Sequence, residues 1–268
     1  MSKRPVPRFN TPLIETHCHL DYLKADTLDN LLAQAANAGI ERILTIAVSP
    51  DNLAKVNALT LQYPQVYGTQ GVHPHEADHY TAAVDAQIRE TATRNARIRA
   101  IGEIGLDYYY EHSDRAAQRR AFEQQLQIAC ELDLPVVIHS RDADDDMQHV
   151  LKGFEQSLTR RGVIHSFTAG PELADYAIAQ GWYLGFNGIA TFPKAENVRE
   201  IVRRTPAEQI LLETDAPYLT PVPWRGHENA PAYLPLVAEK IAELKALAVE
   251  DFLAIAHASS CRLFFPNA

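Results

Sequence analysis

The feature of this sequence that most restricts its fold is a regular alternation of short apolar runs with amphipathic segments. Eight strand-like runs each end near Gly, Pro, His or an acidic residue. They cover residues 13–17, 42–47, 66–71, 98–103, 135–139, 162–165, 182–186 and 209–214. Segments of helical period lie between them, such as 27–38, 51–61, 115–132, 171–180 and 197–204. Strict alternation predicts a parallel sheet, and eight units predict an α/β fold closed into a (β/α)8 TIM barrel.

The whole chain, residues 1–268, fits a single domain of this kind, with residues 1–12 as an N-terminal arm. A proline-rich stretch at 217–226 follows the eighth run, and helical segments at 231–246 and 249–264 should complete the outer ring. No internal repeat or linker marks a second domain. The alternative is an open doubly wound sheet, but no G-x-G-x-x-G follows the first strand.

Charge and composition restrict the partners of the chain. With 25 basic and 34 acidic residues, the net charge is −9, the wrong sign for a broad basic surface that grips nucleic acid. A polyanionic substrate must therefore be attracted locally. No apolar stretch is long enough to span a membrane, no signal sequence is recognisable, and no obligate protein partner is indicated. Cys18, Cys130 and Cys261 are odd in number and widely spaced, so we expect reduced thiols in the cytoplasm.

The first strand ends in two histidines separated by one residue, His17 and His19. Side chains alternate along a strand, so both imidazoles should point to one face and Cys18 to the other. Such a pair suits a divalent metal ion, but taken alone it is equally compatible with a structural role.

Other strands end in similar residues. In a TIM barrel the carboxyl ends of the strands face one mouth, where polar residues are more often catalytic than structural. Six metal-capable residues reach that mouth: His17, His19, Glu103, His139, His165 and Asp215. Four imidazoles and two carboxylates are too many for one tetrahedral ion but fit two divalent ions that share a carboxylate, for which Glu103 is the natural bridge.

The motifs around these residues carry a family resemblance. The segments IETHCHLD at 14–21, GVHPH at 71–75, GEIGLDYY at 102–109 and LETDAPYL at 212–219 resemble the TatD family of metal-dependent nucleases, among the amidohydrolase-type barrels. Arg225, Gly226, Asn229 and Pro231 match its closing signature. The resemblance covers nearly the whole chain. It implies a dinuclear or metal-variable site that hydrolyses phosphodiester bonds in DNA, often as an exonuclease that trims 3′ ends.

The resemblance also implies how the ligands divide. His17, His19 and Asp215 would hold one ion, His139 and His165 the other, and Glu103 both. We expect Glu103 and Asp215 to be catalytic, with Asp215 as general base. Two divalent ions are expected, with zinc, magnesium and manganese as candidates. Imidazoles favour zinc or manganese, whereas magnesium prefers oxygen ligands.

Further residues are candidates for substrate binding. Arg141 and Arg225 could clamp a phosphate bidentately, or form surface salt bridges. His73 and His75 lie in a loop after the third strand, where one of them could donate to a phosphate oxygen. Tyr108, followed by two more tyrosines, suits stacking on a base of single-stranded nucleic acid, although ordinary packing explains such a run equally well.

Two buried-strand carboxylates complete the expected site. Glu15 shares strand parity with His17, and Glu213 shares it with Asp215, so both should support the metal ligands from below. The alternative is a buried pair that shares a proton. Glu15 is also where the chain departs from the family, which usually has Asp there.

These features predict a DNase that acts on single-stranded DNA ends, with RNA as a further substrate. The main alternative is a metal-dependent hydrolase of a different bond, such as a small-molecule ester or amide or an aminoacyl-tRNA, because the same metal machinery serves all of these. A non-catalytic binding protein is the third possibility, and the complete ligand set argues against it.

Overall fold

Eight parallel strands pair in the order in which they occur along the chain. They are β1 (Leu13–Cys18), β2 (Ile40–Thr45), β3 (Val66–Gln70), β4 (Ile98–Asp107), β5 (Val136–Arg141), β6 (Gly162–Ile164), β7 (Tyr183–Phe186) and β8 (Ile210–Leu212). The structure is a computed structural model that describes residues 4–266. It confirms the single-domain TIM barrel, and the open doubly wound alternative is wrong because chain order is kept from β1 to β8.

The barrel closes between β8 and β1 through side chains as well as backbone. The Thr16 hydroxyl donates to the carbonyl of Leu212 at 2.9 Å, and the backbone N–H of Asp215 donates to the carbonyl of His17 at 2.9 Å. The Glu15 carboxylate accepts from the backbone N–H of Thr214 at 3.0 Å. These bonds continue past the short β8, so Asp215 lies directly beside the end of β1.

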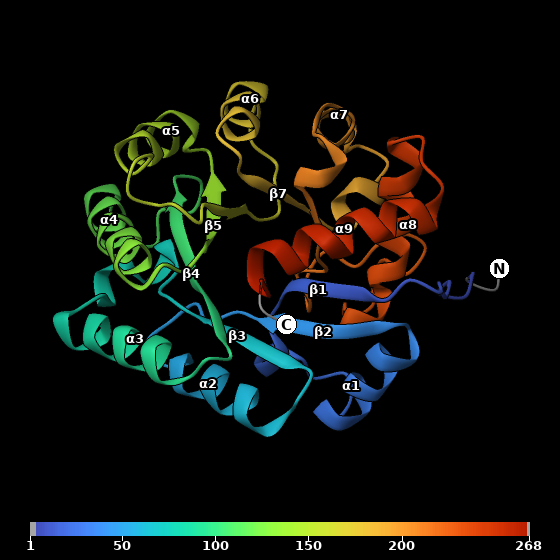
Figure 1. Cartoon of the computed structure of the whole chain (residues 1–268), viewed down its shortest axis with the longest axis horizontal. Coiled ribbons are helices and arrows are strands. Elements are labelled where there is room, and N and C mark those ends of the chain that lie inside the picture. The colour runs from blue at the N-terminus through green and yellow to red at the C-terminus, as the bar shows by residue number, and fades with distance from the viewer. Residues whose placement is uncertain (1–3, 267–268) are drawn as a thin grey trace.

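Helices surround the strands, as Figure 1 shows. They are α1 (Leu28–Asn37), α2 (Leu53–Gln62), α3 (Ala82–Arg94), α4 (Arg115–Leu132), α5 (Asp144–Gly153), α6 (Pro171–Ala179), α7 (Glu196–Arg204), α8 (Leu234–Leu244) and α9 (Val249–Phe264). The predicted helices at 115–132 and 249–264 have the bounds of α4 and α9. The helix predicted at 231–246 is one turn of 3-10 helix followed by α8.

Local caps explain where several helices begin. The side chains of Thr27, Thr81 and Asp114 accept backbone N–H bonds at the starts of α1, α3 and α4. Each cap satisfies a donor that has no partner within its helix.

The interior of the barrel is apolar at its amino-terminal end. Inward-facing residues of the strands, such as Ile14, Val137 and Leu211, form one cluster with Phe264 and Phe265. Phe264 is the last residue of α9 and Phe265 comes directly after it. Helix α9 crosses an end of the barrel in Figure 1. Because this end is filled, the space left for polar side chains lies at the opposite end.

A bulge in β4 alters one predicted boundary. The run at 98–103 was expected to end at Glu103, but β4 continues to Asp107. Its register against β5 shifts between Ile101 and Ile104, and a Cβ on Gly102 would lie 2.7 Å from the Cβ of Val137. Only glycine fits this close approach, so Glu103 projects from a bulge within the strand.

The N-terminal arm packs on the last helices where it is described. Arg4 pairs with Glu239 of α8 at 2.6 Å, and the backbone N–H groups of Asn10 and Thr11 donate to Glu250 of α9. Residues 1–3 of the predicted arm lie outside the described residues. Among residues 4–266, no helix has the length and apolarity needed to cross a membrane.

Candidate metal centre

Glu103 is the point at which imidazoles from several strands converge. Its Oε1 lies 2.8 Å from Nε2 of His165 and 3.1 Å from Nδ1 of His139. The same oxygen is 3.4 Å from Nε2 of His73, and Oε2 is 3.4 Å from Nε2 of His17. The bulge in β4 thus places one buried carboxylate between imidazoles on both sides.

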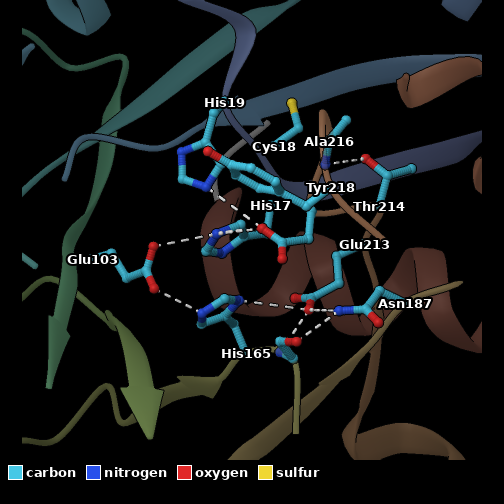
Figure 2. A network of polar contacts seen from close by, with 12 residues as sticks. His17, Cys18, His19, Glu103, His165, Asn187, Glu213, Thr214, Ala216 and Tyr218 are labelled. Carbon is cyan, nitrogen blue, oxygen red and sulfur yellow. Dashed lines mark hydrogen bonds and ion pairs between the residues drawn. The ribbon is translucent and has the colours of Figure 1, made fainter. Parts of the chain in front are cut away.

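A second carboxylate, Asp215, lies beside the two histidines that end β1. Its Oδ1 is 3.6 Å from Nε2 of His17 and 3.5 Å from Nε2 of His19. Its left-handed backbone, with φ of 57°, follows directly on the closure of the barrel. Figure 2 shows His17, His19, Glu103 and His165 turned toward one another. Cys18 points away and packs in the cluster between strands and helices, as strand alternation predicts.

The chemistry of these groups fits divalent metal ions. Ligand atoms within 4.8 Å of one another form three sets: His17, His19 and Asp215; His17, Glu103 and His165; and His73, Glu103 and His139. All six predicted ligands are therefore brought together, and His73 joins them. Both ring nitrogens of His17 are buried without a hydrogen bond in the described chain, and its Nε2 lies 3.4 Å from the Glu103 carboxylate. Buried polar atoms without partners are destabilising, and coordination to an ion would satisfy them.

The electrostatics keep the carboxylates ionised. Burial opposes ionisation of Glu103, but His165, His73 and His139 hold the pKa of its carboxyl well below its usual range. Burial likewise opposes ionisation of Asp215, and the bond from His19 and the charge of His17 lower its pKa. Burial, with His165 nearby, lowers the pKa of His17. Burial likewise opposes the charged forms of His19, His139 and His165, but the neighbouring carboxylates raise the pKa values of these three imidazoles. Because metal ions bind neutral imidazoles, ion binding at these three residues would compete with protons.

Glu213 supports the centre from behind. Its Oε1 lies 3.7 Å from Nδ1 of His165, which directly follows β6, two strands from β8 in the barrel wall. The same oxygen accepts from the backbone N–H of Ser166 at 2.6 Å and from Nδ2 of Asn187 at 3.3 Å (Figure 2). Glu213 thus contacts an imidazole, the geometry expected for a carboxylate that orients a metal ligand.

Glu15 has a different role. Its Oε1 accepts from the backbone N–H groups of His17 and Thr214, both at 3.0 Å, and it contacts no imidazole. Burial raises the pKa of its carboxyl to about 8. The Glu15 side chain therefore joins β1 to the segment after β8.

Asp107 was not among the predicted site residues, yet it holds the outer part of the centre. Its Oδ2 lies 2.8 Å from Nε2 of His139 and 3.0 Å from Nε2 of His75. Its Oδ1 accepts from the backbone N–H groups of Tyr109 and Tyr110. The GEIGLD motif includes Asp107, so the sequence did contain this residue as a candidate. It was missed because a strand that ends at residue 103 would not place Asp107 at the mouth of the barrel.

A cavity of about 940 Å³ opens over these ligands. It is bordered by His73, His75 and Arg141, three of the predicted substrate contacts. The guanidinium carbon of Arg141 lies 4.1 Å from the ring centroid of Tyr109 and 4.7 Å from that of Tyr110. No carboxylate in residues 4–266 forms an ion pair with Arg141. An unpaired cation thus faces the cavity of an acidic protein.

Two other predicted substrate contacts lie away from the cavity. The Tyr108 hydroxyl donates to Asp146 at 2.6 Å, and the guanidinium of Arg115 covers its ring. Arg225 is exposed and stacks on the ring of Phe192, with its guanidinium carbon 3.8 Å from the centroid. Neither side chain borders the cavity, because each is held by a partner on the outer loops.

Comparisons with known proteins agree with this geometry. Residues 14–265 match the family model of the TatD related DNases. The chain is 36% identical to the uncharacterized metal-dependent hydrolase YabD of Bacillus subtilis, covering 95% of this chain and all of that one. It is 37% identical to the uncharacterized metal-dependent hydrolase YcfH of Escherichia coli, covering 96% and 97% of the two chains.

Solved structures show the same architecture. The crystal structure of YjjV, a TatD homologue of Escherichia coli, superposes with a TM-score of 0.89 at 30% identity, covering 94% of this chain and 97% of the other. A TatD family hydrolase of Entamoeba histolytica superposes with a TM-score of 0.85 at 19% identity, covering 96% and 99%, which is a likeness of fold.

Proposed function

Because this chain belongs to the TatD related DNase family of metal-dependent hydrolases, we propose that it hydrolyses phosphodiester bonds and removes nucleotides from the 3′ ends of single-stranded DNA. The observation that carries the proposal is the unpaired guanidinium of Arg141 in a cavity lined by the clustered ligands. A local cation beside a metal centre suits a phosphate, whereas the overall charge of −9 repels one.

The donor set fits two divalent ions. His17, His19 and Asp215 would hold one ion, His139 and His165 the other, and Glu103 would be shared. Bound ions of this kind polarise phosphoryl oxygens and lower the pKa of water. Zinc and manganese suit the imidazoles best, and magnesium remains a candidate.

The chain's own residues would do the remaining work. Arg141, steadied by two tyrosine rings, would donate two N–H bonds to one phosphate. His75, whose ring Asp107 orients through Nε2, would contact the same phosphate. The Asp215 side chain is 14% exposed and borders the cavity, so its carboxylate could accept a proton from the attacking water. Tyr108 and Arg225 receive no role in this proposal.

We place this activity in the cytoplasm. Cys18, Cys130 and Cys261 are free thiols, in keeping with a reducing compartment.

One observation favours the alternative substrate class. Glu76 and Asp142 also border the cavity, and their carboxylates would attract a cationic group better than a polyanion. An aminoacyl ester, as in aminoacyl-tRNA, or a small ester or amide with an amine would satisfy them.

The proposal is tested with 5′-labelled single-stranded DNA and protein supplied with zinc, manganese or magnesium. We expect stepwise shortening from the 3′ end, and loss of cleavage in His139→Ala. His257→Ala is the matched control, because that histidine pairs with Glu41 on the far side of the barrel. Turnover of a carboxylic ester without cleavage of DNA or RNA in any metal would contradict the nuclease assignment.

A further inference from the structure

Three exposed tyrosines border the cavity over the metal centre. Tyr109, Tyr110 and Tyr218 have exposed fractions of 57%, 51% and 52%. Exposed apolar surface gathered beside a cavity can mark a site where a ligand packs. The three differ in what already covers their rings.

Tyr109 and Tyr110 are engaged with a cation. The guanidinium of Arg141 lies over both rings, and the ring of His112 is stacked on Tyr110 at 5.7 Å with an interplanar angle of 12°. Asp107 fixes the backbone of both tyrosines. This pair therefore serves to position Arg141.

Tyr218 has no such partner. Its hydroxyl forms no hydrogen bond with the residues that the structure describes. Its ring meets that of His19 edge to face, with the centroids 6.1 Å apart and an interplanar angle of 68°. Figure 2 shows the Tyr218 side chain next to His19. Ile189 and Leu219 border the same cavity, so the surroundings of the ring are partly apolar.

The loop that carries Tyr218 is held at several points. The Nδ2 of Asn229 donates to the carbonyls of Thr214 and Tyr218, and the backbone N–H of Asn229 donates to the carbonyl of Pro217. The N–H of Tyr218 donates to the carbonyl of Asp215 at 2.9 Å. A backbone fixed in this way loses little conformational entropy when a ligand stacks on the side chain that it carries.

From these observations we propose that Tyr218 forms a stacking subsite for the base of the nucleotide whose phosphate is bound at the metal centre. Its ring centroid lies 6.1 Å from that of His19, one of the clustered ligands, so a base attached to a phosphate at that cluster can reach the ring. The choice of a nucleotide as ligand rests on the proposed function.

The subsite implies a specificity. Every base has an aromatic face, so stacking on Tyr218 accepts all four bases. The base must first leave its neighbours, which favours single-stranded ends over duplex DNA. The two residues would thus recognise different parts of one nucleotide: Arg141 binds the phosphate, and Tyr218 binds the base.

The test compares two ligands by calorimetry, using protein loaded with manganese. Deoxyadenosine 5′-monophosphate has a base, and 2-deoxyribose 5-phosphate lacks one. We expect the first to bind roughly tenfold more tightly to the unaltered protein, the size of one base–aromatic stack. Tyr218→Ala should abolish this preference, while Tyr218→Phe should keep it because the hydroxyl is not used.

Arg141→Ala is the matched control. It should weaken both ligands by the same factor and leave the preference unchanged. The proposal would be overturned if the unaltered protein bound both ligands equally or bound neither. It would also be overturned if the preference survived in Tyr218→Ala or was lost in Tyr109→Ala. Binding is measured without turnover, so the two proposals can fail separately. If the preference depends on Tyr218 but the protein cuts no DNA, only the exonuclease assignment is overturned. Cleavage without the preference would overturn only the subsite.

Discussion

The two ends of the barrel are equally buried but have opposite chemistry. At the amino-terminal end, Ile14, Val137 and Leu211 face inward and pack with Phe264 and Phe265. At the carboxyl-terminal mouth, the inward residues are His17, His165 and Glu103, which are 0%, 5% and 3% exposed. The first end gains stability from the burial of apolar surface, whereas the second buries ionisable groups whose desolvation opposes folding.

This difference explains how one barrel can be stable and also hold a cluster of buried ionisable groups. Each unsatisfied buried polar group costs about 1–3 kcal/mol, and a fully buried large apolar side chain stabilises by about 1.5–3 kcal/mol. The free energy gained by burial at the apolar end can therefore offset the cost of burying polar groups at the mouth. Substitutions at the mouth should impair activity more than folding, and substitutions at the apolar end should do the reverse.

The largest effect is expected at Glu103. Glu103→Gln removes the charge on which four imidazoles converge, so cleavage of single-stranded DNA should fall about 10³-fold or more. Far-ultraviolet circular dichroism should show a folded chain. If Glu103→Gln kept activity within tenfold of the unaltered protein, the mouth would not be the end on which activity depends, and the contrast between the two ends would be wrong.

The apolar end should respond in the opposite sense. Phe264→Ala opens a cavity beneath the barrel, so the free energy of unfolding in urea should fall by about 3–5 kcal/mol. The turnover per folded molecule should stay the same at low temperature. Leu61→Ala is the control, because Leu61 is 68% exposed and its loss should change stability by about 0.5 kcal/mol or less.

Metal removal should affect the mouth alone. An ion at 100 times its dissociation constant stabilises the folded state by about 2.7 kcal/mol, so a chelator should lower the melting temperature. The shift should persist in Phe264→Ala and shrink in His139→Ala. An equal shift in both variants would place the stabilising ion elsewhere.

Asp107 should have a smaller effect, because it acts through His139 and His75. Asp107→Asn keeps the shape of the side chain but removes its charge, and we expect manganese affinity to fall about 10- to 100-fold. Asp146→Asn is the matched control, since Asp146 accepts from Tyr108 outside the cavity. Unchanged affinity in Asp107→Asn would show that the imidazoles are positioned without it.

Much of this arrangement could be predicted from the sequence because it follows from strand alternation. A residue at the end of a parallel strand reaches the mouth of the barrel wherever its helices lie, so the positions of His17, His139 and His165 followed from local pattern. Helices α3 and α5 were not among the segments predicted. In α3, Ile88 is the one buried residue, which leaves little amphipathic pattern. Helix α5 is short and begins with three aspartates, so its apolar stripe covers only Met147, Val150 and Leu151.

The remaining features depend on packing between segments distant in sequence. Asp107 reaches the mouth because Gly102 packs against Val137 of the next strand and allows the bulge in β4. Among the tyrosines, Tyr108 is turned outward by Asp146 on α5. Side-chain direction in such loops depends on partners that a local pattern does not specify, so the sequence did not distinguish Tyr108, which lies outside the cavity, from Tyr218, which borders it.

Anomalous X-ray diffraction from crystals grown with manganese tests the central claim most directly. The account predicts two peaks at the mouth of the barrel, one among His17, His19 and Asp215 and one beside His139 and His165, with Glu103 in contact with both. Peaks confined to other parts of the molecule, or no peak within reach of Glu103, would contradict it.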